Sequence, residues 1–301
     1  MGQFFIKNKK NLGFILVIIT SICYGTMPAV TQKCYALGLS VETTLATRYL
    51  LGTSLIWLFI LIAKRPWRTS GRQLIFLLII GVISFCCTFC MSSSYRYLPG
   101  AIAAILVFLY IIYVNVIEVI IGREKVYRSR VLCLVFIIIG VILVIYTPGD
   151  INGLSFTGIV LAFLAGVFYA AMSMGMGAKR VKNISAEVIM GYVLLVPTII
   201  IVAKCVIEGD PVFPSESWQW FWTIILAIGP GFLASICFCA AVKIIGASTA
   251  SMINTSEPVF AYFAGILIMS DKITWTATLG GLVVVIVILV LNITERKREL
   301  N

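Results

Sequence analysis

The chain has 301 residues, of which 61% are hydrophobic and 12% are charged, and its mean hydropathy is +1.07. A soluble domain averages about 45–50% apolar and about 25% charged residues, so this composition excludes a soluble globular protein and a disordered one. The net charge of +11 is expected to lie in cytoplasmic loops, with no role in nucleic-acid binding. The chain has no histidine, so we expect no metal site and no cofactor.

Ten apolar segments follow one another along the chain, and each is long enough to cross a bilayer as a helix. Polar breaks separate them, and the shortest breaks are at 96–99 and 243–246. The sequence therefore predicts an all-α membrane protein with ten transmembrane helices. The predicted spans are 12–32, 43–63, 74–95, 100–121, 130–147, 156–177, 186–206, 219–241, 247–269 and 274–293.

The basic residues are distributed unevenly between the two sides of this arrangement. With the N-terminus inside, 18 of the 23 Lys and Arg residues fall in inside segments and 4 fall in outside segments, while Arg48 lies within a helix. Lys and Arg are enriched in cytoplasmic loops. The bias predicts an N-in, C-in protein of the cell (plasma or inner) membrane, with both termini cytoplasmic.

The two halves of the chain resemble each other at nearly constant offsets. An offset of 145 positions pairs Tyr24 with Tyr169, and an offset of 147 pairs Cys90 with Cys237. The polar breaks match in the same order. We therefore expect two repeats, 1–150 and 151–301, with five helices in each.

The number of helices in each repeat determines their relative orientation. Because five is odd, the second repeat enters the membrane from the opposite side, and the repeats are inverted. Inverted repeats are typical of secondary transporters, which bind substrate near the bilayer midplane between the repeats.

Several short motifs resemble those of a known family. They are Tyr24-Gly25, Arg48-Tyr49-Leu50-Leu51, Gly122-Arg123-Glu124-Lys125, Glu257-Pro258-Val259-Phe260 and Ser270-Asp271-Lys272-Ile273-Thr274. Over residues 12 to 293 the chain resembles the EamA-type transporters of the drug/metabolite transporter superfamily. It departs from their pattern at Tyr110-Ile111, where many first halves have Ser-Pro, and at Asp271, where Glu is usual.

The resemblance has direct implications for fold and function. It implies ten helices in two inverted five-helix repeats, and export of small metabolites such as amino acids. It also implies that helices 1, 3, 4, 6, 8 and 9 line the substrate cavity. It does not identify a substrate.

Glu257 is the strongest single candidate for function. It lies about eleven residues into the ninth predicted span, close to the bilayer centre, where a carboxylate is costly and indicates a substrate or proton pathway. It is therefore the coupling candidate, with a proton as the candidate ion. The structural alternative is that Glu257 and Pro258 only hold a helix kink, because Pro258 removes a backbone donor.

Three tyrosines fall near the centres of their predicted helices, at the depth of Glu257. These are Tyr24, Tyr110 and Tyr169, and Tyr110 is the repeat counterpart of Glu257. With the carboxylate they can form a cage for a cationic group. The alternative is that they only pack between helices and bond to backbone carbonyls. Further candidate binding residues are Tyr113 and Asn254.

Two further features are assigned structural roles. Arg48 lies about six residues, or roughly 9 Å, into the second span, where it can reach the surface or pair with Glu42. Gly229, Pro230 and Gly231 interrupt the eighth span and form a candidate hinge, because such breaks are tolerated where backbone is buried in protein or lines a cavity.

These residues favour a secondary transporter that exports a small metabolite by alternating access around a midplane cavity. The alternative within the class is a carrier of organic cations such as quaternary amines, held by the tyrosines and Glu257. A passive channel is a weaker alternative. A membrane-embedded enzyme is not expected, because such chemistry needs His, paired acids or a metal cluster. The predicted partners are a small-molecule substrate and the lipid bilayer.

Overall fold

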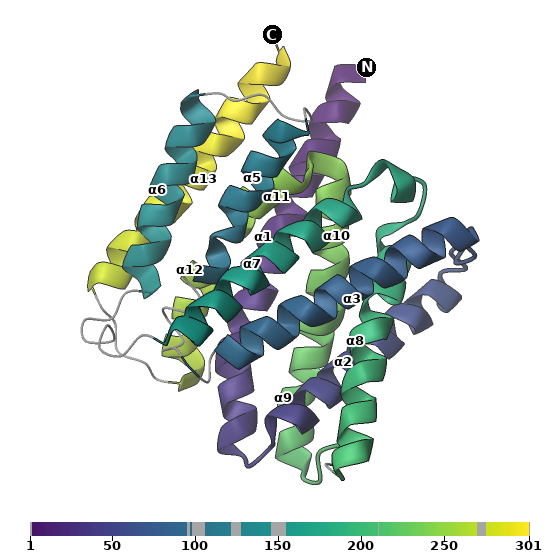
Figure 1. The fold of residues 1–301 in the computed structure, drawn as a ribbon. Helices are drawn as coiled ribbons and strands as arrows, with labels where there is room; N and C mark the ends of the chain where they lie inside the picture. The colour runs from purple at the N-terminus through teal and green to yellow at the C-terminus, as the bar shows by residue number, and fades with distance from the viewer. Residues whose placement is uncertain are drawn as a thin grey trace.

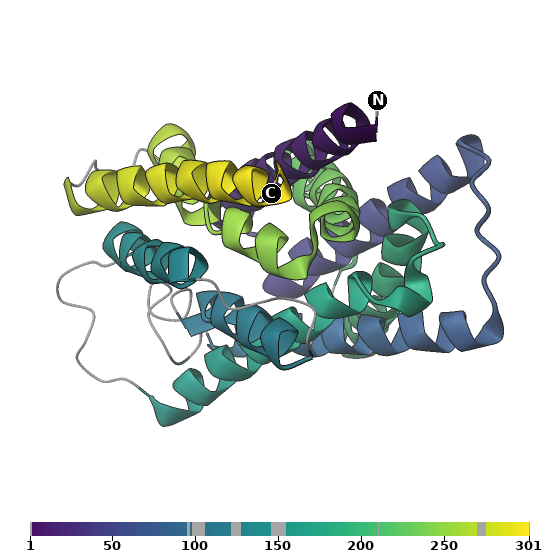
Figure 2. The ribbon, with the colours of Figure 1, turned by 90° about the horizontal axis from the view of Figure 1, so that it is seen from above.

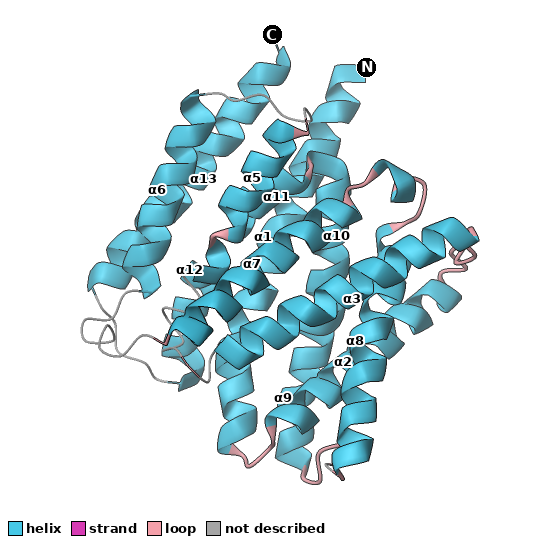
Figure 3. Cartoon of the chain, viewed as in Figure 1, coloured by secondary structure: helices cyan, strands magenta, loops and turns pink. Residues whose placement is uncertain are grey.

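The structure, a computed structural model, describes residues 2–94, 97, 106–121, 128–145, 155–209, 211–269 and 275–300. In this part of the chain, helices are joined by loops and turns (Figure 3). The first half contains α1 (Gly2–Ala36), α2 (Val41–Ile62), α3 (Gly71–Ser94), α5 (Tyr110–Ile120) and α6 (Arg128–Ile145). The second half contains α7 (Phe156–Met176), η1 (Lys179–Val181), α8 (Ala186–Glu208), α9 (Ser217–Leu226), η2 (Ala227–Ala234), α10 (Ser235–Ile245), α11 (Ala247–Asn254), α12 (Glu257–Ala264), η3 (Gly265–Met269) and α13 (Trp275–Leu300).

Local sequence signals explain several helix ends. The hydroxyl of Ser40 accepts a hydrogen bond from the backbone N–H of Thr43 at 3.0 Å, which satisfies one of the donors left free at the start of α2. The predicted break at 243–246 is confirmed, because Gly246 has a φ of +81° and separates α10 from α11. Glycine adopts this conformation without steric cost. The predicted break at 96–99 lies outside the described residues, apart from its second position.

Seven helical segments are long and apolar enough to cross a membrane: Lys10–Ala36, Val41–Ile62, Gly71–Met91, Phe156–Met176, Ala186–Glu208, Ser217–Ile245 and Ala247–Met269. Shorter apolar helices at Leu106–Ile120, Val131–Gly140 and Thr278–Val287 lie within the other three predicted spans. Large apolar side chains are exposed on the outer surface; Ile207 and Leu267, for example, are each 83% exposed. The chain is therefore a multi-pass membrane protein, and the count of ten spans stays a prediction.

The helices pack in a pattern that is preserved when the two halves are exchanged. α1 packs against α10 and α12, and its counterpart α7 packs against α3 and α5. α2 packs against its own counterpart α8, as α6 does against α13 (Figure 1). α1 descends and α7 ascends in Figure 1, and both chain ends lie at the top. Viewed from above, α6 and α13 lie together at one edge, opposite the α2–α3 connection (Figure 2). This is the arrangement expected of two inverted repeats.

Hydrogen bonds locate the pseudo-two-fold axis between α2 and α8. The hydroxyls of Thr53 and Thr198, which are 145 positions apart, lie 2.8 Å from each other, and both residues are buried. Thr53 also donates to the carbonyl of Leu194 at 3.5 Å, and Thr198 donates to the carbonyl of Tyr49 at 3.4 Å. Leu194 and Tyr49 are again 145 positions apart. A residue that contacts its own repeat counterpart must lie on the axis.

The same symmetry extends outward from these threonines. Thr47 donates to the carbonyl of Val212 at 2.8 Å, and its counterpart Tyr192 donates to the carbonyl of Trp67 at 3.1 Å. Val212 and Trp67 also differ by 145 positions. The predicted offset therefore holds for contacts between the halves as well as for the sequence.

One ion pair lies at each end of the α2–α8 helix pair. Glu42 in the first turn of α2 lies 3.2 Å from Lys204 in the last turns of α8. Glu187 in the first turn of α8 lies 3.0 Å from Arg65, which follows the end of α2. Each acidic residue thus pairs with a base at the far end of the counterpart helix.

Two of the spanning segments are interrupted. The segment 217–245 passes through the π-helix η2, which contains Pro230, so the predicted break at Gly229, Pro230 and Gly231 takes the form of a wider helical turn. The segment 247–269 is broken at Thr255 and Ser256, between α11 and α12. Both interruptions lie beside α1.

Candidate functional site

The break in the ninth predicted span determines the position of Glu257. α12 begins at Glu257, followed by Pro258, which lacks the N–H that a first helical turn leaves unpaired in any case. A carboxylate in the first turn is favoured by the positive end of the helix dipole. The chain therefore has a helix start, with an acidic side chain in its first turn, inside a segment long enough to span the membrane.

Asn254 connects Glu257 to two other helices. Its amide nitrogen donates to the Glu257 Oε2 at 3.2 Å and to the Tyr110 hydroxyl at 3.3 Å. Its amide oxygen accepts from the Ser21 hydroxyl at 3.1 Å. Asn254 is fully buried, so these bonds replace the water that its amide would otherwise need. One side chain thus joins α1, α5 and α12.

The three predicted tyrosines meet around this network. The rings of Tyr110 and Tyr169 lie 4.3 Å apart between centroids, and the hydroxyl of Tyr24 lies 3.5 Å from that of Ser235. All three tyrosines are within electrostatic range of the Glu257 carboxyl. Tyr110 is buried, whereas Tyr24, Tyr169 and Glu257 are partly accessible. We call Tyr24, Tyr110, Tyr169, Asn254 and Glu257 the midspan cluster.

Gly25 allows α1 to approach α12 beside this cluster. A Cβ at this position would lie 2.6 Å from the Cβ of Phe260, 2.8 Å from the carbonyl oxygen of Glu257 and 2.9 Å from the backbone nitrogen of Ala261. These distances are too short for any side chain. The Tyr24-Gly25 and Glu257-Pro258 motifs, which are far apart in the sequence, are therefore in contact.

Arg48 lies on the α2 side of Tyr24, within electrostatic range of that tyrosine. Its guanidinium carbon is 5.3 Å from the Tyr49 ring centroid, and its Nε is buried without a hydrogen-bond partner among the described residues. Glu42, which the sequence offers as a partner, forms its ion pair with Lys204. A half-buried guanidinium with an unsatisfied N–H can donate a hydrogen bond to an anionic group of a ligand.

The other predicted residues lie outside the cluster or at its edge. Tyr113 packs against Phe163 at 5.3 Å between ring centroids and against Gly166, and its hydroxyl is buried with no hydrogen-bond partner in the part of the chain that the structure describes. The Gly229–Gly231 segment lies against α2, where a Cβ on Gly52 would lie 3.2 Å from the backbone of Gly231. Pro258 is buried at the start of α12.

Sequence reasoning missed two polar contacts of the cluster. The hydroxyl of Ser21 donates to Asn254, and the hydroxyl of Ser235 lies 3.5 Å from that of Tyr24. Serine and threonine are common in apolar helices, so residue type gives no signal for them. The repeat offset could have identified Ser235 and Thr88 as counterparts, since they are 147 positions apart.

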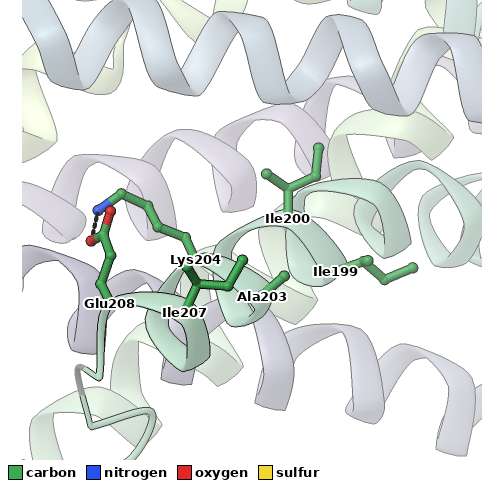
Figure 4. Close-up of a pocket in the computed structure, with 6 residues that line it drawn as sticks. All are labelled: Ile199, Ile200, Ala203, Lys204, Ile207 and Glu208. Carbon is green, nitrogen blue, oxygen red and sulfur yellow. Dashed lines mark hydrogen bonds and ion pairs between the residues drawn. The ribbon is translucent and has the colours of Figure 1, made fainter.

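A surface groove of about 410 Å³ lies elsewhere, along the last turns of α8 (Figure 4). Four apolar residues and the Lys204–Glu208 ion pair, 2.6 Å between nitrogen and oxygen, line it. No residue of the midspan cluster contributes to it. Within the described part of the chain, no three His, Cys, Asp or Glu side chains gather as metal ligands.

Comparisons with known proteins found a matching family, a relative in sequence and a protein of similar fold. The sequence model of the EamA-like transporter family matches residues 11–146 and 156–293. An uncharacterized transporter of Clostridium kluyveri is 20% identical over 296 residues, which are 95% of this chain and 94% of that protein. A protein of known crystal structure is similar in fold, with a TM-score of 0.79, over 95% of this chain and 98% of its own. At 15% identity, this last similarity shows the fold alone.

Proposed function

Because the chain belongs to the EamA-like transporter family, we propose that it is a secondary carrier that exports a small metabolite by alternating access. The observation that carries the proposal is the midspan cluster, in which a carboxylate at a helix break lies within electrostatic range of three tyrosines from α1, α5 and α7. An ionisable residue at membrane depth is expensive and is retained for function by default. A passive channel or a membrane enzyme has no comparable support.

The proposed architecture has ten spans in two inverted repeats, 1–150 and 151–301. Both termini lie in the cytoplasm, and the membrane is the cell (plasma or inner) membrane. The matching contacts of α2 and α8 support the repeats, and the 18-to-4 distribution of basic residues supports the orientation.

We propose an amino acid, or a similar zwitterion, as the substrate. Arg48 and Glu257 both lie within electrostatic range of Tyr24, so one tyrosine has groups of opposite charge in its neighbourhood. Arg48 has an unsatisfied donor for a carboxylate, and Glu257 has an oxygen, Oε2, bonded to a neutral amide that an ammonium group can also approach. A zwitterion satisfies both charges at once.

The alternative substrate is an organic cation. The close Tyr110–Tyr169 pair and Glu257 can hold a quaternary amine by cation–π and charge attraction. This binding mode makes no use of Arg48, which separates the two proposals.

The test is the thermal stability of the purified protein with leucine, choline, a nucleoside and a sugar. A ligand that binds only the folded state raises the melting temperature. We expect stabilisation by leucine that is lost in both Arg48→Gln and Glu257→Gln. The control is Glu208→Gln, which removes an exposed carboxylate outside the midspan cluster and should leave the effect intact.

Other outcomes of this experiment are equally informative. Stabilisation by choline that is lost only in Glu257→Gln would establish the cation alternative. Binding that survives both substitutions would reject the midspan cluster as the substrate site.

Glu257 is also the proposed coupling residue, releasing a proton when substrate binds. In proteoliposomes, uptake of the stabilising solute by the wild type should then depend on an imposed pH gradient. Glu257→Gln cannot exchange a proton, so any transport it retains should be independent of the gradient. Gradient-dependent transport by this variant would reject the coupling role.

A further inference from the structure

The two repeats make corresponding contacts where α1 crosses α10 and where α7 crosses α3. At the first crossing, Thr20 donates to the carbonyl of Ala234 at 3.3 Å. At the second crossing, the thiol of Cys87 donates to the carbonyl of Ala165 at 3.4 Å. Ala165 is the counterpart of Thr20 at an offset of 145, and Cys87 is the counterpart of Ala234 at an offset of 147. The two crossings therefore have the same register.

One helical turn further along α1, the correspondence fails. Tyr24 and Ser235 have hydroxyls 3.5 Å apart, and their counterparts by the same offsets are Tyr169 and Thr88. Among the described contacts, Tyr169 and Thr88 are not bonded to each other. Tyr169 packs on Tyr110 at 4.3 Å between ring centroids and on Phe238 at 6.1 Å.

Thr88 is held by another partner. Its hydroxyl lies 2.9 Å from the hydroxyl of Tyr49 and also donates to the carbonyl of Ser84 at 3.1 Å. The counterpart of Tyr49 is Leu194, which has no hydroxyl, so Ser235 has no equivalent competitor at that position. The two helix crossings thus have the same register, and they differ in which side chains are hydrogen-bonded to each other.

We propose that the Tyr24–Ser235 and Tyr169–Thr88 contacts are made alternately during transport. This inference rests on the proposed carrier function. A carrier with two inverted repeats reaches its opposite state when the repeats exchange conformations. The contact seen between α1 and α10 then breaks, and its counterpart forms between α7 and α3. Each tyrosine in its bonded position closes one side of the midspan cluster.

The Tyr49–Thr88 bond biases this exchange toward the present state, because Tyr49 occupies an acceptor position of the Thr88 hydroxyl for which Tyr169 would compete. A single hydrogen bond of this kind shifts an equilibrium about twofold to tenfold. Tyr49→Phe should therefore raise the ratio of the exchanged state to the present state by about that factor. Tyr24→Phe and Ser235→Ala should shift the ratio in the same direction.

The experiment is hydrogen–deuterium exchange of the full chain in lipid nanodiscs, followed by mass spectrometry. In Tyr24→Phe, helix ends at one membrane face should exchange faster and those at the opposite face more slowly. Adding Tyr169→Phe removes the competing contact, so the double variant should return toward the wild-type pattern. Thr26→Val is the matched control, because the described bond of the Thr26 hydroxyl lies within α1, to the carbonyl of Cys23 at 2.9 Å.

Two results would overturn the proposal. One is a Tyr24→Phe variant with the wild-type exchange pattern. The other is a double variant that moves further from the wild type, as two independent packing defects would. Solute uptake by wild-type proteoliposomes tests the carrier function separately. Uptake without the compensating shifts rejects the alternating contacts alone, and shifts without uptake of any solute tested reject the carrier.

Discussion

Gly25 is the residue at which α1 and α12 come closest, and it leads to a stability prediction. Gly25→Ala would place a methyl group 2.8 Å from a carbonyl oxygen and 2.9 Å from a backbone nitrogen of α12. Backbone atoms yield less easily than side-chain ends, and overpacking of this kind costs about 1–3 kcal/mol. We expect a corresponding fall in the free energy of unfolding, measured by denaturant titration in mixed micelles.

Gly71→Ala serves as the control for this substitution. A Cβ at Gly71 would meet no atom within 4 Å, so its unfolding free energy should match that of the wild type. Equal stabilities of the two variants would show that α1 and α12 are not packed as closely as described.

The buried Thr53–Thr198 pair leads to a second residue-level prediction. Thr53→Val removes a hydroxyl and leaves that of Thr198 with fewer partners, at an expected cost of about 1 kcal/mol. Thr198→Val should cost about the same. The double variant should cost less than the sum of the two, because both lose the same bond. A double-mutant cycle of unfolding free energies measures this coupling, and additive costs would contradict it.

The sequence located the residues of the midspan cluster but not their partners. Helical rise and the repeat offsets put Tyr24, Tyr110, Tyr169 and Glu257 at one depth, and the structure brings them together. Their role in binding stays a prediction. That Arg48 has no acidic partner among the described residues could not be foreseen, because Glu42 pairs with Lys204, a residue 162 positions away on another helix.

At the scale of elements, the π-helix η2 shows how a predicted break is accommodated. Pro230 has no backbone N–H, so the regular α-helical ladder cannot continue through it. The chain widens into a π-helix over Ala227–Ala234 and continues as α10. Glycine and proline in the sequence indicate the place of such an interruption. Its hydrogen-bond pattern depends on the packing of α2, which the sequence alone does not give.

This packing leads to a prediction for the glycines around η2. A Cβ on Gly52 would lie 3.2 Å from the Gly231 backbone, whereas one on Gly229 would meet no atom within 4 Å. Gly52→Ala should therefore lower the unfolding free energy by about 1 kcal/mol or more. Gly229→Ala should be neutral or slightly stabilising, and it is the matched control. A destabilised Gly229→Ala would contradict the open space that the structure shows around this position.

Helix boundaries were predictable where a capping residue or a glycine marks them, as at Ser40 and Gly246. They were less predictable at the ends of the chain. α1 begins at Gly2 and α13 continues to Leu300, beyond the predicted spans 12–32 and 274–293. Charged residues at a helix end stop a hydropathy window without stopping the helix.

At the scale of the whole molecule, the basic residues predict how the chain is oriented. We expect a green fluorescent protein fused after Arg68 to fluoresce, because the α2–α3 loop carries three basic residues and should be cytoplasmic. Alkaline phosphatase fused after Phe213 should be active, because the loop before α9 should lie outside. Each site should carry both reporters in turn as reciprocal controls, and the opposite pattern would reverse the proposed orientation.

The repeat was the most informative whole-molecule feature of the sequence. Offsets of 145 and 147 relate contacts such as Thr47–Val212 and Tyr192–Trp67, although few of the residues themselves are identical. Apolar residues conceal such similarity, because many of them fit the same helix face. The departures from symmetry, at Tyr169 and Thr88, depend on which side-chain partners compete in three dimensions.

The bond between Thr53 and Thr198 has an evolutionary consequence. A threonine that meets its own counterpart is the contact that two identical chains would form across a two-fold axis. An ancestor of five helices could have built it by inserting one copy upright and one inverted. Such a dimer must treat both sides of the membrane equally. In one joined chain the counterpart residues can differ, as Tyr49 and Leu194 do, and the two sides of the membrane need no longer be treated equally.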